Sequence, residues 1–426
     1  MLSRLELIDL LATAGDVTLG WSSPVIPKLY SNDSSENPLG RPITEDEDAW
    51  LVSLISIGAM TGPFVAGFIS EKFGRKVGLL SLAVPHMVSL FSMAFATNIY
   101  VFYACRLLAG ISTGGGYTLL PMYIAEIAHE SNRGSLSQTL NVFWAFGPET
   151  PYYLVAANKI KEAKESLLVL RSFNEEKVQK ELEHIMDSIK AEESGHLRDI
   201  IKNKVLMKAF FVCIVLVISQ ELSGFLAITF YLQTIFEAAG TQIASDVSAL
   251  IVGFFTFLSS FFTPVLIDRL GRRLLLVISC FGMVITLSML GAFFYLQEST
   301  EVSTESIYWL PVFSLVLYIF AFHFGICSVP WTLISELFPN NVKGKLTPII
   351  TSVCWITSFL ITKFFNDMNN AMGIAGSFWF FSSCCAATGI FSILMVPETK
   401  GKSFSEIQDM LNKPKARVSA GNSEDI

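Results

Sequence analysis

The sequence has few charged residues, and this scarcity decides its class. Only 16% of its 426 residues are Asp, Glu, Lys or Arg, whereas soluble domains carry about 25%. Hydrophobic residues reach 52%, Phe alone occurs 35 times, and the mean hydropathy is +0.51. This balance excludes an ordinary soluble domain and predicts a protein embedded in the lipid bilayer.

Several chemical signatures are missing from the sequence as well. It contains no Cys-x-x-Cys pair, no His-rich cluster, no nucleophile elbow and no phosphate-binding glycine loop. It therefore predicts no catalytic residue, no metal site and no cofactor. The net charge of −7 argues against a nucleic-acid partner. The seven cysteines lie inside apolar runs, which favours buried thiols over disulfides.

A clean signal peptide is missing too, because Glu6, Asp9 and Asp16 interrupt the first apolar stretch. Ten apolar segments nevertheless approach the ~20 residues with which a helix crosses a bilayer. We therefore expect an all-α, polytopic membrane bundle of about ten spans. They lie near residues 7–28, 49–70, 77–96, 101–124, 206–235, 247–267, 274–296, 308–333, 346–366 and 373–396.

Loop charge predicts how these spans are oriented. Lys and Arg gather in alternate loops and are missing from the others, which lie near residues 97–100, 237–246, 297–307 and 366–372. Basic loops face the cytoplasm, so we expect both termini there, in a multi-pass protein of the plasma membrane. The loop 29–48 then lies outside, and its Asn32-Asp33-Ser34 sequon predicts glycosylation at Asn32.

Residues 155–204 differ from the rest of the chain. They are rich in Lys and Glu and repeat Leu and Ile at helical spacing, which predicts two or three amphipathic helices in a cytoplasmic linker. We expect this linker to divide the chain into four parts. These are an incomplete membrane half at 1–154, the helical linker at 155–204, a six-span half at 205–400 and a cytoplasmic tail at 401–426.

The two membrane halves repeat one another. Three sets of segments match, namely Glu71–Lys76 with Asp268–Arg273, Glu126 and Arg133-Gly134 with Glu336 and Lys343-Gly344, and Pro148–Thr150 with Pro397–Thr399. Two related halves around a central loop are typical of transporters.

The repeat reveals a gap in the first half. Lys343 and Pro397 are 54 residues apart, which is room for two spans, whereas the matching Arg133 and Pro148 are only 15 apart. The difference, 54 − 15 = 39 residues, corresponds to about two spans with their loop.

What remains inside the gap is a short apolar stub at residues 135–147. A helix of that length reaches about 20 Å, which is too short for a ~30 Å bilayer core. We expect the stub at the cytoplasmic interface. The alternative is a shallow span through 139–157, which would push Glu149 into lipid and invert every later loop.

The repeated Gly-Arg turns can form ion pairs with acids at helix ends. Such pairs at the cytoplasmic rim would lock one conformation and release it in another. In the simpler interpretation the arginines only set the topology. The predicted gate consists of Arg75, Glu126, Arg133, Glu149, Arg272, Glu336 and Glu398.

Polar and aromatic residues occur in mid-membrane. Gln220 and Glu221 are costly in lipid and therefore indicate a cavity. Pro330 removes a helical hydrogen bond and bends its span, and Trp331 beside it offers an aromatic platform for a sugar ring. Trp355 is a second indole, and ordinary packing is the alternative for both.

A separate feature of the spans is a set of small residues that permit close helix packing, namely Gly110, Gly114, Gly115 and Gly116.

Together these motifs resemble the sugar-porter family of the major facilitator superfamily over nearly the whole chain. The resemblance also includes Arg106–Gly110, Pro121–Glu126, Gln220–Gly224 and Pro397–Gly401. It implies a major facilitator fold of twelve spans, of which about ten are present here, with a sugar site between two halves and alternating access. The segments most similar to insect facilitated trehalose transporters are Leu19–Pro24 and Pro148–Leu154.

Carried over by position, the resemblance implies a sugar site formed by Gln220, Glu221, Trp331, Trp355 and Asn141. Several positions depart from the family's glucose carriers. Glu221 replaces a second Gln, Leu226 and Cys354 replace Asn, and Asn141 replaces Gln, so amide groups are lost and glucose specificity is not expected. Proton-coupled members have Asp where Ser22 stands, which favours facilitated diffusion.

We therefore expect a facilitative carrier of a small-molecule sugar, trehalose or a hexose, and not an enzyme. Because the missing fifth and sixth spans line the cavity in this family, we expect this chain to transport poorly or not at all. Two alternatives stay open. One is a non-transporting variant that associates with another membrane subunit, and the other is a membrane receptor that binds the sugar without moving it.

Overall fold

The computed structural model describes residues 18–33, 35, 37–127, 150–170, 175–192, 203–240, 243–299, 304–402 and 404–412. Every regular element within these residues is a helix. Within these residues, seven helical segments are long and apolar enough to cross a membrane, and two of them, Lys204–Phe230 and Leu310–Leu337, run across a break between two helices. Two further helices, α5 and α14, contain 29 and 26 residues, which is more than the ~20 that a span needs. The prediction of a helical membrane bundle is confirmed.

The first membrane half has four helices in its described part. The final part of the predicted first span is helical from residue 18, with α2 as its last segment. The helices are α2 (Ser22–Tyr30), α3 (Glu45–Phe73), α4 (Arg75–Ala94) and α5 (Ile99–Ile127). The stub at 135–147 and the gap around it lie outside the described residues.

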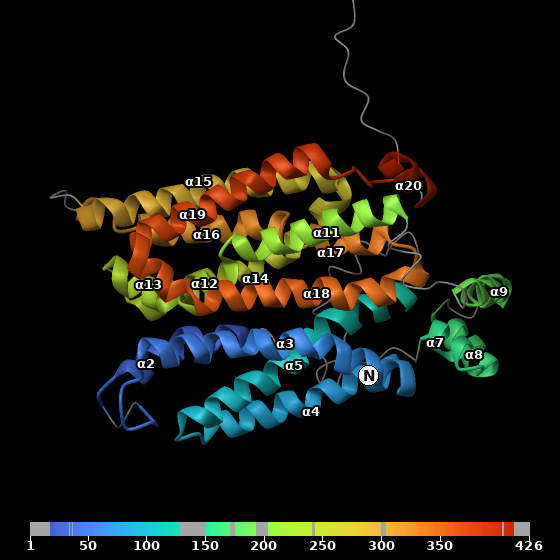
Figure 1. Cartoon of the computed structure of the whole chain (residues 1–426), viewed down its shortest axis with the longest axis horizontal. Helices are drawn as coiled ribbons and strands as arrows, with labels where there is room; N and C mark the ends of the chain where they lie inside the picture. Colours follow the sequence, from blue (N-terminus) through green and yellow to red (C-terminus); the bar gives the residue numbers. More distant parts are fainter. Residues whose placement is uncertain are drawn as a thin grey trace, which may run out of the picture.

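The second half supplies six span positions, two of which are interrupted. The helices are α11 (Lys204–Leu222), α12 (Phe225–Phe230), α13 (Leu232–Ala239), α14 (Ser245–Leu270), α15 (Arg272–Ser299), the 3₁₀ turn η2 (Thr304–Ile307), α16 (Leu310–Phe324), α17 (Val329–Leu337), α18 (Asn340–Lys363), α19 (Phe365–Met395) and the short α20 (Phe404–Asn412). Figure 1 shows the two halves as adjacent layers of long helices, with α18 and α3 along their boundary.

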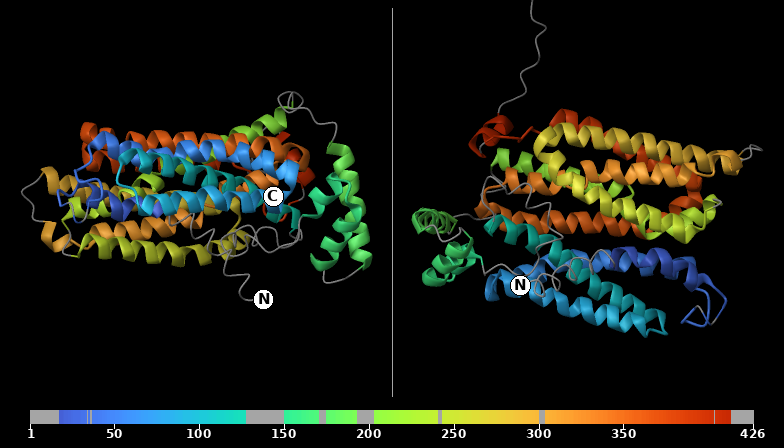
Figure 2. Two further views of the ribbon diagram at one scale, coloured as in Figure 1. Left: turned by 90° about the horizontal axis from the view of Figure 1, so that it is seen from below. Right: turned by 180° about the vertical axis from the view of Figure 1, so that it is seen from behind.

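Three shorter helices lie between the two membrane halves in the part of the chain that the structure describes. α8 (Ile160–Leu170) and α9 (Glu175–Glu192) lie within the predicted linker, and α7 (Pro151–Ala156) begins before the predicted linker start at residue 155. Leu154, Ala163, Leu167, Val178 and Leu182 form a small core between them. They lie at one end of the bundle, which we call the linker end (Figure 2). The loop 31–44 and the turn between α18 and α19 lie at the opposite end, which we call the loop end.

Close packing of α3 on α5 explains the glycines predicted at helix contacts. A Cβ atom added to Gly110 would lie 2.0 Å from the Ile55 carbonyl oxygen, and one added to Gly114 would lie 2.0 Å from that of Ala59. Gly58 and Gly62 of α3 face the same contact. Without side chains the two backbones approach closely, as in other small-residue contacts between membrane helices.

Buried Arg106 joins the helices of this half. Its side chain is fully buried and donates to the carbonyl oxygens of Thr18 at 2.7 Å, Leu51 at 3.1 Å and Val52 at 3.4 Å. Its guanidinium also lies 5.6 Å from the ring of Trp21. These carbonyl acceptors compensate for the desolvation of the cation, as a buried charge requires.

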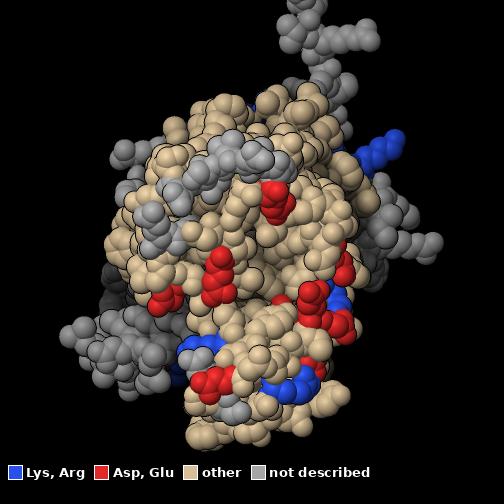
Figure 3. All heavy atoms as spheres, turned by 90° about the vertical axis from the view of Figure 1, so that its left-hand side faces the viewer, with Lys and Arg blue, Asp and Glu red and all other residues tan. Residues whose placement is uncertain are grey.

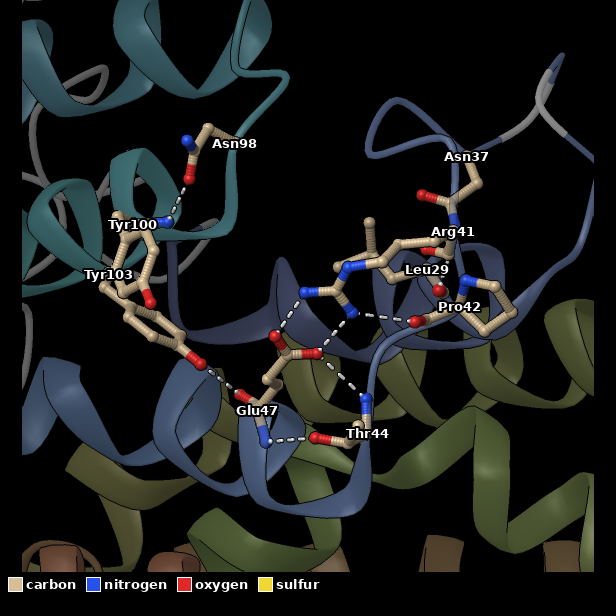
Figure 4. A network of polar contacts seen from close by, with 9 residues as sticks. All are labelled: Leu29, Asn37, Arg41, Pro42, Thr44, Glu47, Asn98, Tyr100 and Tyr103. Carbon is tan, nitrogen blue, oxygen red and sulfur yellow. Dashed lines mark hydrogen bonds and ion pairs between the residues drawn. The ribbon is translucent and has the colours of Figure 1, made fainter.

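Hydrogen bonds of the described residues 37–47 hold the chain that enters α3 (Figure 4). The buried Asn37 amide donates to the carbonyl oxygens of Leu29, Ser31 and Arg41. Thr44 and Glu47 form a reciprocal capping box, which satisfies free amides at the helix start. Arg41 binds the Glu47 carboxylate through two nitrogens at 2.8 and 2.5 Å, and this raises the pKa of Arg41.

Candidate functional site

Two helix breaks lie in the middle of the second half. Gly224 has a left-handed backbone with φ of 85° and separates α11 from α12. A Cβ at Gly224 would lie 2.6 Å from the Phe381 ring. The second break separates α16 from α17, where Gly325 packs against α15 and the Ile326 amide donates to Ser279 Oγ at 3.1 Å. The predicted break before Trp331 is therefore confirmed.

Gln220 and Glu221 lie at the end of α11, directly before the first break. Glu221 is only 7% exposed, and its Oε1 accepts a hydrogen bond from Cys354 Sγ of α18 at 3.3 Å. The Oε1 atom of Gln220 is buried and has no hydrogen-bond partner. An unpaired buried acceptor costs free energy, so this atom is suited to a ligand that can donate to it.

Three aromatic rings meet beside these polar groups. Trp331 lies in the first turn of α17, the helix after the second break, and Trp355 follows Cys354 on α18. Tyr117 of α5 contacts both, with ring centroids 5.9 Å from Trp331 and 5.6 Å from Trp355. Trp355 is 4% exposed, and its Nε1 donor has no partner. The site therefore offers one unpaired donor and one unpaired acceptor next to aromatic walls.

The structure places four of the five predicted sugar-site residues in the second half, on α11, α17 and α18. Asn141 lies outside the described residues. Tyr117 was missed by the sequence analysis. The sequence indicates it only as an aromatic residue directly after Gly114, Gly115 and Gly116 in a span. This pattern predicts helix packing unless the facing helix is known.

Predicted gate residues of the second half lie together at the linker end. Arg272 Nη2 lies 2.8 Å from Glu336 Oε1, and Thr399 Oγ1 donates to Glu336 Oε2 at 2.5 Å. The Glu398 carboxylate accepts from the backbone amides of Arg272 and Arg273 at 3.0 and 3.1 Å. All of these contacts lie within the second half.

The matching cluster of the first half can be followed only in part. Arg75 donates to the Ser70 carbonyl oxygen at 3.2 Å and lies 5.7 Å from the Tyr153 ring of α7. The side chain of Glu126 and the whole of Arg133 and Glu149 lie outside the described residues.

At the loop end, polar contacts join the two halves instead. Lys363 Nζ lies 2.6 Å from Asp46 Oδ1, and the side-chain amides of Asn366 and Asn370 donate to Asp48 and Glu45 at 3.2 and 3.3 Å. Figure 3 shows this end face on, with acidic and basic side chains adjacent in its lower part, which belongs to the first half. Asn32 of the predicted sequon is exposed at the same end.

Comparison with known proteins identifies the family. Residues 10–147 and 146–411 match the family described as "Sugar (and other) transporter". The chain belongs to this family. Among its relatives, the facilitated trehalose transporter Tret1 of Apis mellifera ligustica is 31% identical over 438 residues, covering 94% of this chain and 86% of the relative. The Tret1 protein of Polypedilum vanderplanki is 32% identical over 447 residues, covering 96% and 88%.

Solved structures establish the fold. The proton:xylose symporter XylE bound to 6-bromo-6-deoxy-D-glucose superposes with a TM-score of 0.75 at 22% identity, covering 96% of this chain and 99% of that one. A partially occluded inward-open conformation of XylE from E. coli gives a TM-score of 0.70. This sugar transporter therefore has the major facilitator fold. Its fold and its family are both those of transporters.

Proposed function

We propose that the chain binds its sugar at the cluster formed by Gln220, Glu221, Trp331 and Trp355. One observation carries this proposal: Gln220 Oε1 and Trp355 Nε1 are buried without partners in the middle of a membrane bundle. A sugar hydroxyl both donates and accepts, so hydroxyls can pair with both atoms, while the aromatic walls cover the apolar face of the ring. The relatives are named as trehalose transporters, so trehalose is the first candidate and a hexose the second.

Equilibrium binding of labelled trehalose and glucose to the purified chain tests this assignment. Gln220→Ala and Trp355→Phe each remove one unpaired atom, and each is expected to weaken binding about tenfold. Trp309→Phe, at an exposed indole remote from the two breaks in sequence, is the matched control and should bind like the parent. Unchanged affinity in both site variants would exclude this cluster as the sugar site.

The gap in the first half supports a second part of the proposal, that this form transports poorly. The alignment with the Polypedilum vanderplanki protein has 447 positions but uses 96% of 426 residues, or about 409. The remainder, 447 − 409, leaves about 38 positions of the relative without a counterpart. This number is close to the 39 residues missing between the repeated motifs, and the family match also divides at 146–147.

Sugar counterflow in liposomes measures this impairment. The chain is compared with a version in which the corresponding two spans of a trehalose transporter are inserted between Gly147 and Pro148. We expect at least tenfold faster counterflow in the restored version, because the cavity regains its missing wall. Equal, saturable counterflow by both chains would mean that the gap does not limit transport.

The same gap favours binding without transport as the second candidate function. In that case the chain would act as a sugar receptor or as a regulator of another membrane subunit. Normal sugar binding together with absent counterflow would support this role. Loss of both activities, with retention in the endoplasmic reticulum, would support a defective variant.

We also propose that the arginine–carboxylate cluster at the linker end is a cytoplasmic gate and that the loop end faces the exterior of the plasma membrane. The predicted loop charges support this orientation, as does the exposed Asn32 in its sequon. Glycosidase treatment of the expressed protein should increase its gel mobility, and Asn32→Gln should abolish that shift. A chain without glycan whose loop 31–44 is protected in intact cells would reverse the orientation.

A further inference from the structure

Tyr117 is the aromatic residue through which the first half reaches the central site. It belongs to α5, whereas the two indoles that it contacts belong to α17 and α18 of the second half. Tyr117 is 39% exposed, in contrast to 4% for Trp355. Part of its surface is therefore still available for contact.

The ring angles show that Tyr117 is not stacked in parallel on either indole. The Tyr117 ring is inclined by 49° to Trp331 and by 84° to Trp355. A near-perpendicular contact buries an edge of one ring against the face of the other, so Trp355 does not cover Tyr117 as a parallel stack would. The three rings thus form walls at different angles instead of one closed stack, and this arrangement suits a ligand that has an apolar face and a polar rim.

We propose that Tyr117 is a third aromatic contact for the sugar, supplied by the first half. This inference rests on the proposed sugar site and extends it, because the resemblance assigned no residue of α5 to that site. It has a distinct consequence: the bound sugar contacts both halves through residues outside the gap. Binding should therefore survive the loss of the two spans even where transport does not.

Equilibrium binding of labelled trehalose to the purified full chain tests this contact. Tyr117→Ala should weaken binding about tenfold, whereas Tyr117→Phe, which keeps the ring, should stay within about twofold of the parent. Tyr117→Leu keeps apolar volume without an aromatic face and should resemble the alanine variant. Tyr100→Ala is the matched control on the same helix, because Tyr100 also contacts a ring, that of Tyr103, at the loop end.

The outcomes separate the two proposals. If the parent binds trehalose and Tyr117→Ala or Tyr117→Leu binds equally well, the Tyr117 contact is wrong while the site stands. If Tyr117→Phe is as weak as Tyr117→Ala, the ring face does not make the contact. If the parent binds no sugar although it elutes as a folded monodisperse protein, the proposed site fails and Tyr117 with it.

A second, independent observation concerns the boundary between α3 and α18. Contacts along it follow an antiparallel seam: Asp46 with Lys363, Trp50 with Phe359, and Ser56 with Ser358. Ser352 Oγ continues the seam by donating to the Met60 carbonyl oxygen at 3.1 Å. The seam therefore covers the part of α3 from the loop end to mid-helix.

Its loop end is also its most polar part. Lys363 lies against the Trp50 ring at 4.6 Å as well as against Asp46. The buried Asp48 accepts from Asn366 at 3.2 Å and from the Tyr30 hydroxyl at 3.3 Å. Several weak contacts in one place can be broken in turn, which suits a closure that opens and re-forms.

We infer that Asp46, Asp48, Lys363 and Asn366 form a latch that holds the loop end shut over the central site. The inference rests on the alternating access that the family resemblance implies. The rate at which a reagent modifies the native Cys354 thiol reports whether this latch is open. Cys354 is 4% exposed and contacts Glu221. The latch must open before a bulky polar reagent can reach this thiol from the loop end.

The latch can be tested without transport by treating the purified chain with a charged methanethiosulfonate. Mass spectrometry of the peptide that contains Cys354 measures how fast this thiol is modified. Asp48→Ala, which removes a buried acceptor of two hydrogen bonds, should raise that rate about tenfold, and Lys363→Ala, at a solvent-screened pair, about threefold. Exchanging the charges, Asp46→Lys with Lys363→Asp, should restore the slow rate. Arg41→Ala is the matched control, since the Arg41–Glu47 pair lies at the same end but within one half (Figure 4). An unchanged or lower rate in both latch variants would overturn the inference, whether or not the chain moves sugar.

Discussion

The two membrane halves differ in how their helices pack. In the first half, glycines bring α3 and α5 into backbone contact, and buried Arg106 joins the helices through carbonyl oxygens. In the second half, helix breaks at Gly224 and Gly325 open the middle of the bundle and place polar and aromatic groups there. The described part of the first half is thus a compact wall, and the second half holds most of the proposed site. The proposed loss of two spans from the first half would therefore remove less of the binding chemistry than a loss of two spans from the second.

The largest effect is expected from a substitution that disrupts the contact between α3 and α5. Gly114→Leu places atoms where a Cβ would already lie 2.0 Å from the Ala59 carbonyl oxygen, so we expect a loss of more than about 3 kcal/mol of stability or no folded protein. Gly67→Leu on α3 is the control, because a Cβ there meets nothing within 4 Å. Thermal unfolding followed by size-exclusion chromatography measures both. Equal stability of the two variants would contradict the close contact.

The next test compares matched arginines of the two halves. Arg272→Ala leaves Glu336 without its cation and should cost about 2 kcal/mol. Arg75→Ala removes at least a carbonyl contact and a ring contact, and these two contacts together should contribute about 1 kcal/mol. Unfolding temperatures of the two purified variants report the difference. A larger loss for Arg75→Ala would mean that the first-half cluster is the stronger one.

A smaller effect is expected inside the site. Glu221→Gln restores an amide that can both donate and accept, so glucose should bind about threefold more tightly. Glu237→Gln, an exposed change in α13 of the same half, is the control for the loss of charge. Equilibrium binding of labelled glucose measures the change. Weaker binding of glucose to Glu221→Gln would show that the carboxyl group itself recognises the sugar.

The smallest effect concerns the joint between the halves. Asp46 is 78% exposed at its side chain while Lys363 is 13% exposed, so solvent screens the pair. A double-mutant cycle with alanine at both positions should give a coupling of about 0.5 kcal/mol, which decreases at high salt. A coupling that is large and independent of salt would indicate a desolvated pair.

The path of the chain was predictable because hydropathy is a local property. The bilayer requires a run of apolar residues for each crossing, and helices lie at all ten predicted span positions, with residues 7–17 of the first outside the described part. The break before Trp331 was also predictable, since Pro330 cannot continue the preceding hydrogen-bond pattern. The amphipathic spacing of residues 155–204 likewise matches the helices α8 and α9, which share a small core, whereas residues 171–174 and 193–202 of this segment lie outside the described part.

The partners of the site residues were not predictable in the same way. In the sequence Tyr117 is one more residue of a glycine-rich span. Only its contact with Trp331 and Trp355 in the folded chain makes it a candidate for the site. The Asp46–Lys363 pair joins residues 317 positions apart, a separation that no local pattern encodes.

The sequence alone determined the membrane class and the span positions, and it predicts the duplicated plan and the gap in its first copy, because each depends on composition or spacing along the chain. The tertiary structure decided which side chains meet across the halves: Tyr117 with two indoles, Cys354 with Glu221, and Lys363 with Asp46. The physical reason is that these contacts depend on the rotation and depth of each helix, which are set by packing against neighbours and not by the helix's own sequence.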